Sequence, residues 1–176
     1  MKNTTIRELI AEQEVAQRLD SLAAEINAQY AGKPLVLVCV LKGAFMFFSD
    51  LVRRLSVAPE VDFVRVASYG KGTESSRNIN FTKDVELSLE GKHVILVDDI
   101  VDSGHTMYFL CQQFALRGAA SLKVAALVDK KERREMPVVV DYPGFILQKG
   151  FLVGYGLDYA EQYRSLPSIC EVLFSE

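Results

Sequence analysis

The feature of this chain that most constrains its fold is a run of seven consecutive apolar residues, Leu35–Leu41. The run is far shorter than the roughly 20 residues that a membrane helix needs. It also lacks the alternation of apolar and polar side chains that marks a strand with one face in water. A strand this apolar must be covered on both faces, as in a parallel sheet packed between helices. Apolar positions at helical spacing follow it, at Phe48, Leu51, Val52 and Leu55.

The same order of strand and helix recurs along the chain. Further strands are expected at Val61–Ser68, His93–Asp98, Leu122–Val128 and Pro137–Val140. One helix is expected within residues 6–30, where Thr5 and Glu8 have the spacing of a capping box, and another around residues 107–114. Because strands that alternate with helices form parallel βαβ units, the sequence predicts an α/β fold. Its central sheet is expected to be twisted and mostly parallel, with helices on both faces.

The composition narrows the class of protein. At 176 residues, of which 49% are apolar, the chain has the size of one domain and can bury a core without disulfides or a structural metal. Its three cysteines, Cys39, Cys111 and Cys170, lack CxxC spacing, which predicts a reducing, cytoplasmic location. The amino terminus lacks the apolar core of a signal peptide. A net charge of −3 argues against a nucleic-acid-binding protein.

One segment, residues 69–84, interrupts the pattern. It is polar, contains glycine and shows no clear periodicity. A loop this long inside a compact domain is uncommon, and such loops are often active-site lids or binding loops. The sequence therefore predicts a lid here, with a loop of no function as the alternative.

The densest polar cluster follows the strand that begins at His93. Parallel sheets bind ligands beyond the carboxyl ends of their strands, and residues 98–106, with the sequence Asp-Asp-Ile-Val-Asp-Ser-Gly-His-Thr, stand at such an end. A helix that starts at Ser103, Gly104 and Thr106 offers N–H groups and hydroxyls to a phosphate. The three carboxylates beside it would suit the hydroxyls of a ribose and a Mg²⁺ ion. The alternative is that Asp102 or Ser103 only caps the helix.

This cluster, together with Val97, resembles the 5-phosphoribosyl 1-pyrophosphate signature of type I phosphoribosyltransferases. Four other segments resemble the hypoxanthine–guanine branch of that family, in the same order and over essentially the whole chain. They are the pyrophosphate loop Val40–Phe45, the start of the mobile lid Ala67–Gly70, the base-recognition segment Leu127–Lys130, and the carboxyl-terminal hood Phe151–Tyr159 with Arg164.

The resemblance implies the type I phosphoribosyltransferase fold, with a small hood built from the two chain termini. Residues 1–176 would form a single domain with a core at about 35–140. The hood would comprise residues from about 1–15 and 142–176, and the lid would span about 68–84, including Ser68 and Tyr69.

The resemblance also implies a role for each matching residue. The ribose and its 5′-phosphate would be bound by Asp98, Asp99, Asp102, Ser103, Gly104, His105 and Thr106. The pyrophosphate group would be bound by Lys42, Gly43 and Arg164, and the Leu41–Lys42 peptide bond can be cis in the family. The purine would be bound by Lys130, Phe151, Leu152 and Asp158. The implied cofactor is Mg²⁺, held by Asp98, Asp99 and Asp158, and Asp102 would be the catalytic acid or base at N7 of the purine.

The implied reaction transfers the phosphoribosyl group to N9 of hypoxanthine or guanine, giving IMP or GMP and pyrophosphate in purine salvage. The Lys130 ammonium can donate to the O6 carbonyl of a 6-oxopurine but cannot accept from the amine of adenine, so adenine is disfavoured. Xanthine stays open as a secondary substrate. The expected partners are these small molecules and further copies of the chain, as a homodimer or homotetramer, with neither nucleic acid nor membrane.

Several alternatives stay open. The chain could be a regulator that keeps the sugar-phosphate site for sensing, although its charge is negative and only about 34 residues precede the first strand. Lys130 begins a charged run that would ordinarily be a solvated face. Phe151 and Tyr155 could be core aromatics. Two positions depart from the family pattern: Asp98 stands where many relatives carry Glu, and the side-chain role of His105 is open.

Overall fold

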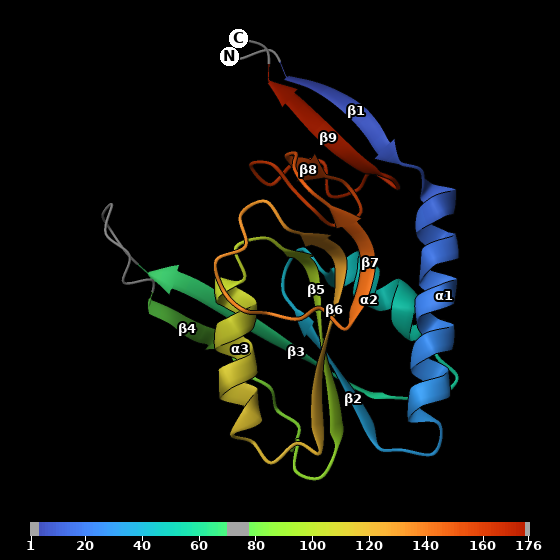
Figure 1. Ribbon diagram of the computed structural model, residues 1–176, viewed down its shortest axis with the longest axis vertical. Coiled ribbons are helices and arrows are strands. Elements are labelled where there is room, and N and C mark those ends of the chain that lie inside the picture. The colour runs from blue at the N-terminus through green and yellow to red at the C-terminus, as the bar shows by residue number, and fades with distance from the viewer. Residues whose placement is uncertain (1–3, 70–77, 175–176) are drawn as a thin grey trace.

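The computed structural model describes residues 4–69 and 78–174. Its larger sheet has the strand order β4-β3-β2-β5-β6-β7 (Figure 1). The strands are β2 (Leu35–Val40), β3 (Glu60–Tyr69), β4 (Asn78–Lys83), β5 (His93–Val101), β6 (Ser121–Lys130) and β7 (Tyr142–Leu147). All neighbours are parallel except β3 and β4. The predicted α/β fold with a mostly parallel sheet is confirmed.

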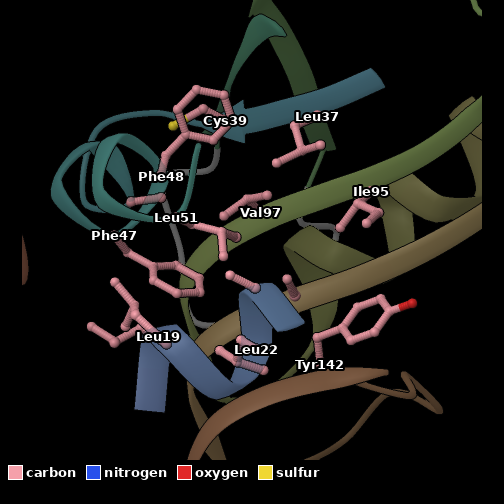
Figure 2. Packing of buried hydrophobic residues seen from close by; sticks show 14 of the residues in the cluster. Leu19, Leu22, Leu37, Cys39, Phe47, Phe48, Leu51, Ile95, Val97 and Tyr142 are labelled. Carbon is pink, nitrogen blue, oxygen red and sulfur yellow. The ribbon is translucent and has the colours of Figure 1, made fainter. Parts of the chain in front are cut away.

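Helices cover both faces of this sheet, as predicted. α1 (Glu12–Tyr30) and α2 (Phe45–Val52) lie on one face and α3 (His105–Ala115) lies on the other (Figure 1). Alternate residues of β2 enter different cores. Leu37 and Cys39 pack among α1 and α2 residues (Figure 2), whereas Val36 and Val38 pack with residues of α3. This division explains why every residue of β2 is apolar.

A smaller antiparallel sheet joins the two ends of the chain. Its order is β1-β9-β8, formed by β1 (Thr4–Ile10), β9 (Ile169–Phe174) and β8 (Leu152–Val153) (Figure 1). The helix expected within residues 6–30 is present as α1, but a start at residue 6 was wrong, because Thr4–Ile10 pairs with β9. The helix begins at Glu12 instead, where the Glu14 carboxylate accepts from the Ala11 N–H at 2.9 Å. The Thr5–Glu8 capping box does not form.

The predicted strand Pro137–Val140 was also wrong. Val138 and Val140 pack against the core on the α3 face, which accounts for their apolar side chains. Their backbone does not pair with a neighbouring strand in the described part of the chain. The strand beside β6 is the next segment, β7, which is anchored where the Asp141 carboxylate accepts from the Val124 N–H at 2.9 Å. Residues 142–147 therefore belong to the large sheet, whereas the hood was expected to begin at about residue 142.

The segment expected to be a loop, residues 69–84, contains a strand. Asn78–Lys83 forms β4, which pairs antiparallel with β3. Phe81 of β4 packs its ring 5.4 Å from that of Phe109, with the guanidinium of Arg117 5.3 Å from its centre. Ile79 and Phe81 alternate with polar residues, but the stretch is too short and too polar for that alternation to be recognised. Residues 70–77 of the expected lid lie outside the described residues.

Candidate active site

The carboxyl ends of the parallel strands meet along one edge of the large sheet, and β5 contributes two carboxylates there. The strand runs three residues further than expected, to Val101, so that Asp99 is a strand residue like Asp98. Asp98 is 7% exposed. Burial, and then the charge of Asp99, raises the pKa of Asp98 well above its ordinary value, and burial raises the pKa of Asp99. Two such carboxylates gain from a cation or from hydroxyl donors placed between them.

The segment after β2 lies directly against this pair. The Leu41–Lys42 peptide bond is cis, as the resemblance allowed. A Cβ on Gly43 would lie 1.7 Å from Oδ2 of Asp99, and a Cβ on Gly156 would lie 2.1 Å from the carbonyl oxygen of Gly43. Gly156 also has φ of 100°, which favours glycine. Glycine at both positions therefore lets three distant parts of the chain meet.

The turn from β5 to α3 forms a small pocket of about 130 Å³. It is lined by Asp98, Ile100, Val101, Asp102, Ser103, Gly104, His105, Thr106 and Met107. Gly104, with φ of 87°, is the N-cap of α3. Neither Asp102 nor Ser103 occupies the cap position, so the helix-cap alternative is wrong. The residues expected to bind a phosphate thus surround one cavity at a helix N-terminus.

Lys130 is the last residue of β6 and is 6% exposed, so the alternative that it lies on a solvated face is wrong. Its Nζ lies 3.6 Å from Oδ2 of Asp102. The other oxygen, Oδ1 of Asp102, is buried and has no hydrogen-bond partner among the described residues. A buried acceptor without a partner is rare in folded proteins, and here it borders a pocket. It is therefore available to a donor on a ligand.

That pocket has a volume of about 560 Å³ and lies between the large sheet and the terminal segments. Its lining comprises Asp99, Ile100, Asp102, Lys130, Glu132, Arg133, Lys149, Gly150, Phe151, Leu152, Leu157, Asp158 and Phe174. The Phe151 ring is 43% exposed, so it is not a core aromatic. Tyr155 is one, being 8% exposed with its hydroxyl donating to Asp50.

Two aromatic rings hold Phe151 in place. The rings of Tyr159 and Phe174 lie 5.3 and 5.7 Å from it, both edge-on, and 5.7 Å from each other. Phe174 comes from β9 at the carboxyl end of the chain. The face of Phe151 is thereby oriented by neighbours from two other segments.

Two cations gather around the carboxylate of Glu161. Arg164 pairs with Oδ1 of Asp158 at 2.7 Å and with Oε2 of Glu161 at 3.1 Å, and its charge partly offsets the rise in the pKa of Asp99 that burial causes. Lys42 pairs with Oε1 of Glu161 at 2.8 Å. The structure therefore brings Lys42 and Arg164 together through one carboxylate, although they are far apart in sequence.

Arg134 supports the site but was not predicted from the sequence. Its guanidinium donates to the carbonyl oxygens of Val101 at 2.8 Å, Asp102 at 2.9 Å and Lys130 at 3.1 Å, and it pairs with Asp129 at 2.5 Å. It thus ties the β5–α3 turn to the end of β6. Arg134 lies in a charged run next to Arg133, and nothing in the sequence distinguishes the two arginines. Only the tertiary structure shows which of them contacts the turn.

The side chain of His105 contacts a residue of the same segment as Arg134. Its Nε2 lies 2.6 Å from Oε2 of Glu135. In addition, the N–H groups of Glu135 and Met136 donate to the carbonyl oxygen of Ser103, at 3.0 and 3.1 Å. Residues 134–136 therefore hold the turn from its outer side.

The carboxylates of the site do not form a complete metal site on their own. Among the described residues, no three His, Cys, Asp or Glu side chains lie close enough together to hold a metal ion alone. Both oxygens of Asp158 are engaged, one by Arg164 and the other by the N–H of Glu161. Asp98 and Asp99 offer the hard oxygen donors that Mg²⁺ takes together with substrate oxygens and water. The residues fit a metal that arrives with a phosphorylated substrate, not a closed protein cage.

The sequence matches the phosphoribosyl transferase domain over residues 6–160. The chain belongs to this family. It is 41% identical over 171 residues to the hypoxanthine phosphoribosyltransferase of Escherichia coli, with 96% of each chain covered. A bifunctional TilS/HprT protein of Listeria innocua is 43% identical over 169 residues, of which the chain spans only 26% of the length. A crystal structure of a Bacillus anthracis hypoxanthine-guanine phosphoribosyltransferase superimposes with a TM-score of 0.90 at 37% identity, covering 97% and 99% of the two chains.

These matches confirm the resemblance to type I phosphoribosyltransferases and their fold. Enzymes of this family need a divalent metal. No helix in residues 4–69 and 78–174 of this phosphoribosyltransferase combines the length and apolarity of a membrane span.

Proposed function

We propose that this phosphoribosyltransferase transfers the 5-phosphoribosyl group from 5-phosphoribosyl 1-pyrophosphate to N9 of hypoxanthine or guanine. The products would be pyrophosphate and IMP or GMP, in purine salvage. The observation that carries the proposal is the ion pair between buried Lys130 and partly exposed Asp102. It lines the same pocket as the exposed Phe151, and Asp102 also lines the small pocket at the β5–α3 turn. The names of the relatives at about 40% identity agree with it.

In this proposal the purine lies in the larger pocket. Phe151 stacks on its ring and Lys130 donates to O6, with the backbone of Leu152 and the side chain of Asp158 at the pocket wall. The unpartnered Oδ1 of Asp102 meets N7 and holds or returns a proton there as C1–N9 bond formation proceeds. Adenine would present a donor to a donor at Lys130, so we expect it to be rejected.

The sugar phosphate lies beside it. The 5′-phosphate occupies the small pocket of residues Asp102–Thr106, at the N-terminus of α3. Asp98 and Asp99 accept hydrogen bonds from the ribose hydroxyls. Their raised pKa values supply a physical reason for such donors to be favoured there.

The leaving pyrophosphate lies on the side of Lys42, Gly43 and Arg164. Lys42 and Arg164 stabilise the charge that develops as the bond to C1 breaks. We propose Mg²⁺ as the metal, held by Asp98 and Asp99 together with substrate oxygens, with Asp158 joining them in place of its contacts with Arg164 and the Glu161 N–H. When bound, it would neutralise charge on the pyrophosphate.

Two further parts of the chain would enclose the site. The segment at 68–84, which starts at Ser68 and Tyr69, is proposed as a lid that excludes water from the reactive sugar. The small sheet, with residues 150–168, is proposed as the hood of a single domain. Its residues Phe151, Leu152 and Phe174 line the larger pocket.

We also propose a homodimer or homotetramer in the cytoplasm. Phe45 of α2 and Val61 and Phe63 of β3 are large apolar side chains that are 37–43% exposed, and Phe63 packs against Phe48 of α2. Exposed apolar side chains that gather in one patch are typical of an interface. The cysteines are free thiols, the state that a reducing cytosol maintains. Light scattering on the purified protein tests the oligomeric state.

The test of the function is a Mg²⁺-dependent assay with 5-phosphoribosyl 1-pyrophosphate and each of hypoxanthine, guanine, xanthine and adenine. We expect IMP and GMP to form, and Asp102→Asn to lower kcat by roughly 10²–10⁴-fold. The control is Lys131→Ala. Lys131 follows Lys130 in the sequence but does not line the pocket, so its loss should leave kcat unchanged. If the protein binds the sugar phosphate but converts none of the four bases, the enzyme proposal fails and the sensor alternative replaces it.

A further inference from the structure

Glu161 occupies a position between the two cations that the proposed function assigns to pyrophosphate. One of its oxygens pairs with Lys42 at 2.8 Å and the other with Arg164 at 3.1 Å. Both cations hold the pKa of Glu161 below its ordinary value. The carboxylate therefore makes the contacts with these two side chains that a small oxyanion would make.

The turn that carries Glu161 has a backbone conformation that its residues do not favour, and contacts with neighbouring side chains stabilise it. Ala160, Glu161 and Tyr163 have φ of 52°, 62° and 72°, a region that residues other than glycine adopt uncommonly. The N–H of Glu161 donates to Oδ2 of Asp158 at 2.9 Å, and Arg164 pairs with the other oxygen of Asp158. The strained turn and its contacts place the Glu161 carboxylate where it is.

The Glu161 carboxylate is open to solvent in both pairs. The Glu161 side chain is 66% exposed, and those of its partners Lys42 and Arg164 are 50% and 19% exposed. Ion pairs this exposed are weak, so a ligand that binds both cations more strongly can displace the carboxylate. As the displaced carboxylate stays nearby, it also repels an incoming anion.

We propose that Glu161 is an internal competitor of pyrophosphate: it pairs with Lys42 and Arg164 in the free protein, weakens pyrophosphate binding and so favours release of that product. This inference rests on the proposed function, because it needs Lys42 and Arg164 to bind pyrophosphate. It assigns a specific role to a residue that touches neither the purine nor the ribose in that scheme.

The test is calorimetric titration of the whole protein with pyrophosphate in the presence of Mg²⁺, which reports binding without turnover. For Glu161→Gln we expect the Kd of pyrophosphate to fall by about two- to tenfold, since each exposed ion pair is worth at most a factor of about five. The gain should shrink at high salt, where exposed charges are screened. Inhibition of the forward reaction by pyrophosphate should strengthen to the same extent.

Two controls separate the possible failures. Glu25→Gln removes an exposed carboxylate that pairs with Arg18 on α1, and it should leave the Kd unchanged. Arg164→Gln should weaken pyrophosphate binding. If Arg164→Gln binds pyrophosphate as the wild type does, the pyrophosphate assignment fails and this inference fails with it. If Arg164→Gln loses affinity while Glu161→Gln gains none, only the role of Glu161 is overturned.

Discussion

The two halves of β5 lie in one strand but are buried with opposite consequences. Val94–Val97 are fully buried apolar residues whose burial stabilises the fold. Asp98 follows and is nearly as buried, but a carboxylate loses its hydration there, which is costly. The first half of the strand therefore contributes stability, and the second half reduces it in favour of a binding site. Variants in the two halves, and in the residues that support them, should separate stability from function.

The largest effect on stability is expected in the core that supports the first half. Phe47 of α2 is fully buried in the same cluster as Val97 (Figure 2). Phe47→Ala should lower the free energy of unfolding by about 4 kcal/mol, because it removes a large buried ring and leaves a cavity. Urea unfolding measures this loss, and the KM values of the folded fraction should stay close to those of the wild type. A large change in KM with little loss of stability would contradict the separation.

The next effect concerns the support of the second half. Arg134→Met breaks a buried ion pair with Asp129 and should lower the free energy of unfolding by about 3 kcal/mol. This value is at the low end for a buried pair, because Lys131 still pairs with Asp129 at 2.5 Å in the variant. It should also raise the KM for 5-phosphoribosyl 1-pyrophosphate, because the carbonyl groups of Val101 and Asp102 lose a common donor.

Arg117→Met is the matched control for this prediction. Arg117 is a partly buried arginine that pairs with Asp84 at 2.8 Å and lies over Phe114, away from the pockets. Its loss should lower stability without changing KM. If both variants raise KM equally, Arg134 acts only through general stability.

The smallest effect is a change in pH dependence at Asp98. Since its pKa is raised in the folded state, the folded protein binds this proton more tightly than the unfolded chain does. Its contribution is therefore favourable below the ordinary value of 3.8 and is lost as pH rises from there through the folded pKa. In metal-free buffer, Asp98→Asn should be more stable than wild type at neutral pH.

The difference between the two proteins should narrow as pH falls, by up to about 1.4 kcal/mol per pH unit within that window. Denaturant unfolding at a series of pH values measures it. A difference that stays constant with pH would show that burial does not raise the pKa of Asp98.

The sequence predicted the parts of the fold that depend on local pattern. The apolar run at 35–41, the buried strand before Asp98 and the helix after Gly104 all follow from spacing and residue type. β1 was missed because its pairing partner, β9, lies at the other end of the chain. β4 was missed because its alternation rests on only two apolar side chains, Ile79 and Phe81, in a short and otherwise polar stretch.

The site divides in the same way. The residues of the turn at 98–106 are contiguous, so their meeting was predictable, and all of them except Asp99 line one small pocket. The burial of Lys130 was not visible in a run of charged residues, and the aromatic contacts of Phe174 with Phe151 join separate segments. Arg134 and Glu161 make tertiary contacts that no local pattern encodes.

The most direct test of the central claim is the ratio of kcat/KM for hypoxanthine to that for adenine, in wild type and in Lys130→Met. The account predicts that the wild type prefers hypoxanthine by at least about 100-fold, because a site built to donate to a carbonyl rejects a base that lacks one. It predicts that Lys130→Met, which retains the length of the side chain but loses its ammonium, reduces the ratio mainly by losing activity with hypoxanthine. Comparable use of both bases by the wild type, or an unchanged ratio in the variant, would contradict it.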